Sequence, residues 1–144
     1  MTPWHAWLPL SLTLLSVGAG AAEIGAVTLL EGSGRLLRGA TWYKLVAGAR
    51  VEESDILEVA EKTQAQIEFK AGSVVNLYGA ATVYLAPPKA KTGPVMLIVP
   101  GGWLKTVTKA PGVQLRTPLL ELTAAEAIVV MRVTKAAVDF FVES

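Results

Sequence analysis

The chain has 144 residues, of which 52% are hydrophobic and 17% charged, and this composition excludes a disordered polypeptide. Its 13 basic and 12 acidic side chains leave a formal net charge of +1, which gives no support to a nucleic-acid partner. Cysteine is absent, so disulfides, thiolate nucleophiles and Cys-ligated zinc sites are excluded.

The first 22 residues have the pattern of an export signal. An apolar stretch over 8–17 is followed by small residues over 18–22, which offer a cleavage site of the A-x-A kind at 19–21. The apolar stretch is short for a membrane span, which needs about 20 residues. We therefore expect cleavage near Ala22, a mature chain over 23–144, and a periplasmic or secreted protein. An uncleaved N-terminal segment, and with it a membrane contact, is the alternative.

The mature chain predicts a single all-β domain. Short runs rich in Val, Ile, Leu, Thr and aromatic residues alternate with turn signals, two of which are Gly79 and the segment 100–102. The expected strands are 26–30, 65–69, 82–85, 95–99, 103–107, 113–116, 128–133 and 138–142. A helical turn beginning at 123–127 is a local alternative. The spacing favours a short-stranded sandwich or a β-solenoid-like domain.

The most specific stretch is Leu45–Leu77. It contains a glycine turn at Gly48, an acidic bend over 52–55 and two apolar strands separated by a Gly-Ser turn. Within 65–70 apolar and polar residues alternate strictly, so the side chains of 65, 67 and 69 share one face of a strand. This face is expected to lie in the core.

An acidic cluster follows Gly48 and is the first candidate site. Its members are Glu52, Glu53, Asp55, Glu58 and Glu61. Basic residues dominate 62–116, so one interpretation is a solvated acidic edge beside a solvated basic edge. The other is a docking surface that steers a charged partner. The cluster has neither EF-hand spacing nor a loop glycine, and no metal is predicted.

No catalytic site is expected. The single histidine, His5, lies in the segment expected to be removed, so the mature chain has no imidazole base for a nucleophilic triad. No phosphate-binding glycine pattern occurs, and no cofactor is predicted. A second candidate surface for ligand contact is an aromatic platform of Trp42, Tyr43, Tyr78, Tyr84 and Trp103, of which Trp42, Tyr43 and Trp103 are the leading residues, although packing is the commoner role of such residues.

The ordered set of segments over roughly 24–142 resembles the FecR-like periplasmic domain. The segments that carry the resemblance are Gly25-Ala26-Val27, Leu45-Val46-Ala47-Gly48, Asp55-Ile56-Leu57, 65–69, Gly72-Ser73-Val74-Val75, Val99-Pro100-Gly101-Gly102 and Thr117-Pro118. The resemblance implies an exported, non-enzymatic module of the cell envelope that acts in protein–protein interaction or signal regulation. Its partner would be another envelope protein, bound through exposed strand edges or turns.

Two alternatives stand beside this interpretation. One is a module that binds a cell-envelope glycan, peptidoglycan or polysaccharide, through Trp42, Tyr43 or Trp103. The other is a remnant domain, because the segment 124–127 stands where the resemblance would place an arginine-glycine-threonine stretch.

Overall fold

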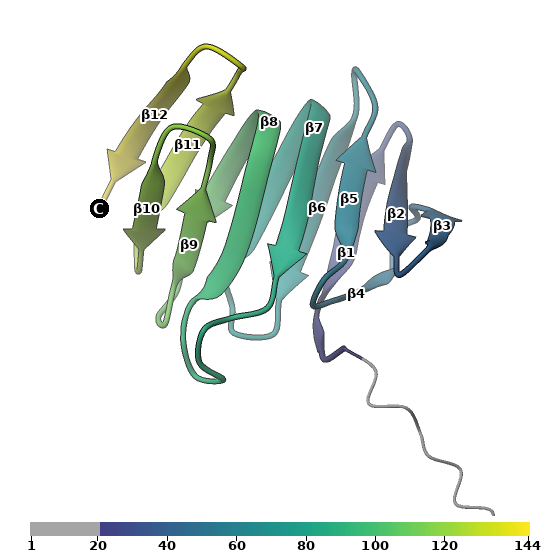
Figure 1. Ribbon diagram of the computed structural model, residues 1–144, viewed down its shortest axis with the longest axis horizontal. Helices are drawn as coiled ribbons and strands as arrows, with labels where there is room; N and C mark the ends of the chain where they lie inside the picture. Colours follow the sequence, from purple (N-terminus) through teal and green to yellow (C-terminus); the bar gives the residue numbers. More distant parts are fainter. Residues whose placement is uncertain (1–20) are drawn as a thin grey trace, which may run out of the picture.

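The computed structural model describes residues 21–144, and this part of the chain is all-β, as the sequence predicts (Figure 1). Its strands are β1 (Glu23–Glu31), β2 (Gly34–Arg38), β3 (Thr41–Lys44), β4 (Arg50–Glu52), β5 (Ile56–Val59), β6 (Gln64–Phe69), β7 (Val74–Ala86), β8 (Val95–Val107), β9 (Val113–Arg116), β10 (Glu121–Ala124), β11 (Ile128–Val133) and β12 (Val138–Glu143). The export signal predicted for 1–22 lies almost entirely outside the described residues. No helix able to cross a membrane occurs among residues 21–144.

The strands form one sheet that curls into a half-barrel, and β7 and β8 are its spine. The first part of β7 pairs with β6 and the last part with β5. The first part of β8 pairs with β9, in parallel, and the last part with β11. Two layers therefore face each other (Figure 1). The front layer runs β3-β2-β5-β7-β8-β9-β10, and the rear layer runs β4-β1-β6-β7-β8-β11-β12.

A single hydrophobic core lies between the layers, and alternation along the strands supplies it. On β6, Ala65, Ile67 and Phe69 are all at most 2% exposed, which confirms the face predicted from 65–70. The same alternation buries Leu77 on β7 and Leu104 on β8. Each of the larger side chains contributes about 1.5–3 kcal/mol through its removal from water.

Two predicted turns are wrong, because Gly79 lies inside β7 and Gly101-Gly102 lies inside β8. The register between these two strands shifts between Tyr78 and Thr82, where both pass from the rear layer to the front layer. A Cβ on Gly79 would collide with the carbonyl group of Ala60, and one on Gly102 would collide with Ala81. Glycine therefore permits the close approach of β7 to β8 at Gly102 and of β7 to the turn at Ala60 at Gly79.

The two ends of the half-barrel differ. At one end the segment 45–49 covers the core: Leu45 is 1% exposed, the Gly48 N–H donates to the Val27 carbonyl, and the Val27 N–H donates to Ala49, each over 2.7 Å. At the other end β10 and β12 are edge strands, each with a single neighbour. The predicted all-β class is thus confirmed, and its architecture is one curled sheet with one covered end.

Candidate binding surfaces

The acidic cluster is built into the covered end of the half-barrel rather than standing free in solvent. Asp55 is 1% exposed, and its carboxylate accepts two hydrogen bonds from the Arg38 guanidinium, over 2.9 and 2.8 Å. The backbone N–H of Glu52 donates to the same carboxylate over 2.8 Å. A buried carboxylate needs such partners, because leaving it unpaired costs several kcal/mol.

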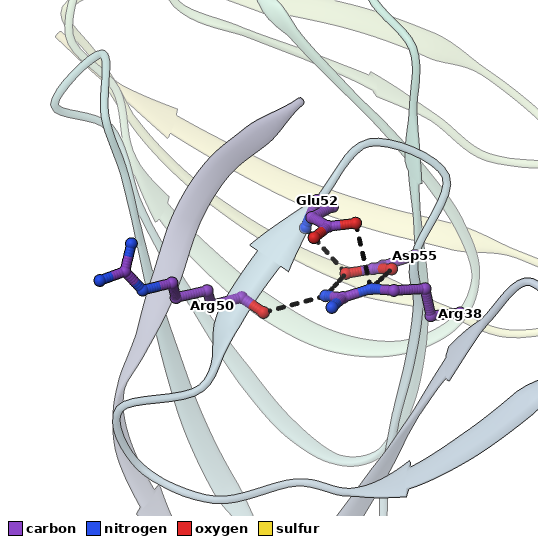
Figure 2. Close-up of polar contacts among 4 residues, drawn as sticks. All are labelled: Arg38, Arg50, Glu52 and Asp55. Carbon is purple, nitrogen blue, oxygen red and sulfur yellow. Dashed lines mark hydrogen bonds and ion pairs between the residues drawn. The ribbon is translucent and has the colours of Figure 1, made fainter. Parts of the chain in front are cut away.

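Arg38 also links the two layers (Figure 2). It belongs to β2 of the front layer, and its guanidinium donates to the carbonyl oxygen of Arg50 on β4 of the rear layer over 3.1 Å. Its Nε lies 3.3 Å from the carboxylate of Glu52. Figure 2 shows that the Arg50 side chain points away from this network, so Arg50 takes part through its backbone alone.

The electrostatics of the network keep Arg38 charged. The hydrogen bond to Asp55 raises the pKa of Arg38 above its ordinary value, while partial burial opposes the rise and the charges of Asp55 and Glu52 add to it. Two of the five acidic residues therefore neutralise one structural arginine. Asp55, buried and fully engaged, offers no surface to a partner.

The remaining acidic residues are scattered. Glu58 accepts a hydrogen bond from Arg35 over 2.7 Å across the β2–β5 pair, on the outer face of the front layer. Glu53 lines a pocket of about 200 Å³ together with Glu23, Lys70 and Lys91. Glu61 is exposed in the turn before β6. Of the cluster, Glu53 and Glu61 alone have no ion pair within residues 21–144.

The aromatic candidates also separate. Trp42 and Tyr43 are exposed on the edge strand β3, and their side chains point to opposite faces of it. The Arg35 guanidinium lies 3.9 Å from the centre of the Trp42 ring, so one face of that ring is covered. Trp103 lies on a different layer and on the outside of β8, opposite Tyr78 on β7.

The large apolar side chains exposed on the outer face of the rear layer form one surface, here called the aromatic face: Tyr78, Trp103, Val107 and Phe141. Their strands, β7, β8 and β12, belong with β11 to one run of neighbours in the sheet. Register places Tyr78, Trp103 and Arg132 in one cross-strand row, and Lys105, Val130 and Phe141 in the next. On β7, β8 and β11 the neighbours Leu77, Leu104 and Met131 are buried, so these rows lie on the outer face, and register places Phe141 on the same face.

The aromatic face combines apolar area with a few fixed polar groups. Trp103 is 47% exposed and Phe141 62% exposed. Arg132 lies 5.6 Å from the Trp103 ring centre and forms an ion pair with Asp139. These residues, with Val130 and Phe140, line a shallow hollow. Exposed apolar side chains gathered around one hollow in this way mark interaction sites on soluble proteins.

The sequence indicates Tyr78 and Trp103 as candidates but not Val107 or Phe141, although a signal for the contribution of β12 is present. In β12 the residues Phe140, Phe141 and Val142 follow one another and are all at least 42% exposed. A strand with one buried face would alternate, so three consecutive apolar residues indicate that both faces of β12 are apolar. The segment 138–142 was predicted correctly as a strand, and its lack of alternation is the signal that points to this surface.

No group of three or more His, Cys, Asp or Glu side chains within residues 21–144 is arranged to hold a metal ion. Comparison with models of protein families, with curated proteins and with solved structures found no match to this chain.

Proposed function

We propose that the chain is a non-enzymatic binding module of the bacterial cell envelope, exported to the periplasm or secreted, which engages another envelope protein through the aromatic face. The proposal keeps the class of function that the FecR-like resemblance implies, including a role in signal regulation, and moves the contact away from the acidic cluster. Its partner is a protein with an apolar patch of its own.

One observation carries the proposal: Tyr78, Trp103, Val107 and Phe141 expose apolar area on neighbouring strands of a single sheet face. Aromatic residues dominate the energy of protein–protein contacts when they are desolvated at the centre of an interface. The acidic cluster contains no aromatic residue, and Arg38 and Arg35 already neutralise three of its members. Rim charges of that kind affect association rate more than affinity.

The two exposed tryptophans permit a matched test. Trp103 and Trp42 are 47% and 43% exposed, and each lies under an arginine. After chemical cross-linking in producing cells, we expect Trp103→Ala to lose the co-purified envelope partner and Trp42→Ala to retain it. Loss of the partner with Trp42→Ala alone would contradict the proposal, and thermal melts of both variants would check that the fold is intact.

A second candidate function is glycan binding. It is favoured by a cross-strand row of polar and aromatic side chains on β6, β7 and β8. Tyr78 lies directly opposite Trp103 on one side and opposite Gln64 on the other, so two aromatic rings adjoin an amide side chain. Retention of the protein on insoluble peptidoglycan, lost with Trp103→Ala, would establish this function in place of protein binding. Trp42 is less suited, because Arg35 lies only 3.9 Å from its ring centre, whereas Arg132 lies 5.6 Å from that of Trp103.

A further inference from the structure

The edge strand β12 continues the core of the half-barrel but has nothing beside it in residues 21–144. Leu77, Leu104, Met131 and Phe140 form one cross-strand row on the inner face of the rear layer. The first three are at most 1% exposed, whereas Phe140 is 52% exposed. Val142 ends the neighbouring inner row and is 42% exposed. The core therefore stops at β12 with apolar side chains still in water.

The backbone of β12 is also open to a further strand. The N–H of Thr134 donates to the carbonyl of Ala137 over 2.9 Å, which closes the β11–β12 hairpin. Because hydrogen-bonded and non-bonded pairs alternate in antiparallel sheets, residues 139, 141 and 143 face β11. The N–H and C=O groups of Val138, Phe140 and Val142 accordingly point away from β11. The hydrogen bond from the N–H of Thr108 to the carbonyl of Ala127, between the chain ends next to β8 and β11, is consistent with the same alternation of hydrogen-bonded and non-bonded pairs.

The edge lacks the usual protection against pairing. Exposed edge strands are commonly guarded by lysine, proline or a bulge. β3 ends in Lys44, and β4 carries Arg50 and Glu52. β12 contains no lysine, arginine or proline, and Arg132 on β11 neutralises its Asp139.

We propose that β12 pairs antiparallel with β12 of a second copy of this chain, so that two half-barrels share one continuous rear layer. In this register Phe140 lies opposite Phe140 of the second copy, and Val138 lies opposite Val142. The backbone N–H and C=O groups of these three residues, which point away from β11, then all form hydrogen bonds between the two copies. Asp139 then lies opposite Phe141. Moving the register by two residues toward the C-terminus places Asp139 opposite Glu143, a like-charge pair that is destabilising.

The size of the contact makes this dimer weak. Phe140 is 52% exposed, so its ring offers about 100 Å² in each copy. A stable interface buries about 800 Å² per partner, and smaller ones belong to transient complexes. The proposal uses the edge and inner face of β12 and does not depend on the function assigned to the aromatic face.

Sedimentation equilibrium of protein recovered from cells expressing the full chain, over a wide concentration range, tests the pairing. We expect a monomer–dimer equilibrium. Phe140→Lys places two lysines opposite each other and should weaken the dimer by at least about tenfold. Phe141→Lys places each lysine opposite Asp139 of the second copy and should leave the dimer intact. Circular dichroism would confirm that both variants fold.

A cysteine link tests the register, because the chain has no cysteine of its own. Opposed residues in a hydrogen-bonded pair have Cα atoms about 5.5 Å apart, within disulfide range. Mild oxidation should therefore join two copies of Phe140→Cys, whereas Val142→Cys, whose counterpart is Val138, should stay unlinked. A folded protein that is monomeric at every concentration would overturn the proposal. So would a dimer that Phe141→Lys abolishes and Phe140→Lys spares, since that contact would lie on the aromatic face.

Discussion

At the scale of single residues, the covered end of the half-barrel depends on Arg38. Its guanidinium satisfies a carboxylate that is 1% exposed and also reaches a carbonyl on the opposite layer. An ion pair at the surface contributes little to the free energy of unfolding, about 0–1 kcal/mol. Breaking a pair with a buried member costs more, because the buried charge is then left without solvation by water. Arg38 thus links β2 to β4 and to the bend that contains Asp55 through hydrogen bonds.

Replacing Arg38 by methionine should lower the free energy of unfolding by about 3–5 kcal/mol, because Asp55 would be left buried without its cation. Since the pKa of Arg38 is raised, its stabilising charge is fully present at neutral pH and is lost only in strong alkali. Urea unfolding at neutral pH therefore measures the whole effect.

A second substitution separates charge from packing. Asp55→Asn added to Arg38→Met removes the stranded charge and should restore part of the loss. An Arg38→Met variant as stable as wild type would show that the network is dispensable. The matched control is Arg35→Met, which removes the ion pair between Arg35 and Glu58 at the surface. It should lower the free energy of unfolding by no more than about 1 kcal/mol.

At the scale of elements, β7 and β8 determine the shape. Each spans both layers, and the crossing point falls at Gly79 and at Gly101-Gly102. The φ of Gly102 is +117°, a backbone conformation that other residues adopt only with strain. Gly102 is needed at this crossing because β7 and β8 approach each other without room for a side chain beside Ala81, and Gly79 is needed because the turn at Ala60 approaches β7 closely.

Gly102→Ala should destabilise the fold by about 1–3 kcal/mol, through backbone strain and a collision with Ala81. Gly39→Ala is the matched control, because Gly39 also has a positive φ but a Cβ added to it would meet nothing within 4 Å. Thermal unfolding of the two variants would compare them. Equal losses would show that strain alone matters and that the close crossing of β7 and β8 does not.

How far the sequence predicts these elements depends on the range of the interactions. Ala65, Ile67 and Phe69 were predicted correctly, because strand alternation is a local property. Gly79 was mistaken for a turn, since the strand that crosses there, and the Ala60 carbonyl beside it, come from elsewhere in the chain. Residues in contact only after folding are invisible to local patterns.

The candidate site shows the same limit. The acidic cluster is dense in the sequence, yet Asp55 pairs with an arginine 17 residues earlier, and this pairing follows from the β2–β5 register. Tyr78 and Trp103, both aromatic candidates in the sequence, are exposed and directly opposite each other, whereas Phe141 joins them from another strand of the rear layer. The composition of the surface was predictable; its assembly depended on topology.

At the scale of the whole molecule, the half-barrel has a covered end and an open end (Figure 1). Most of its exposed large apolar side chains lie on the rear layer. The proposed protein contact through the aromatic face and the proposed pairing of β12 both follow from this asymmetry. The covered end, with Arg38 and the acidic cluster, stabilises the fold and takes no part in either contact.

Photo-cross-linking in producing cells tests this division most directly. A photoreactive residue at Lys105 would lie in the row next to Trp103 on the aromatic face, and one at Glu53 would lie in the acidic cluster. We predict a covalent adduct with a second envelope protein from position 105 and none from position 53. An adduct from position 53, with none from position 105, would contradict the account.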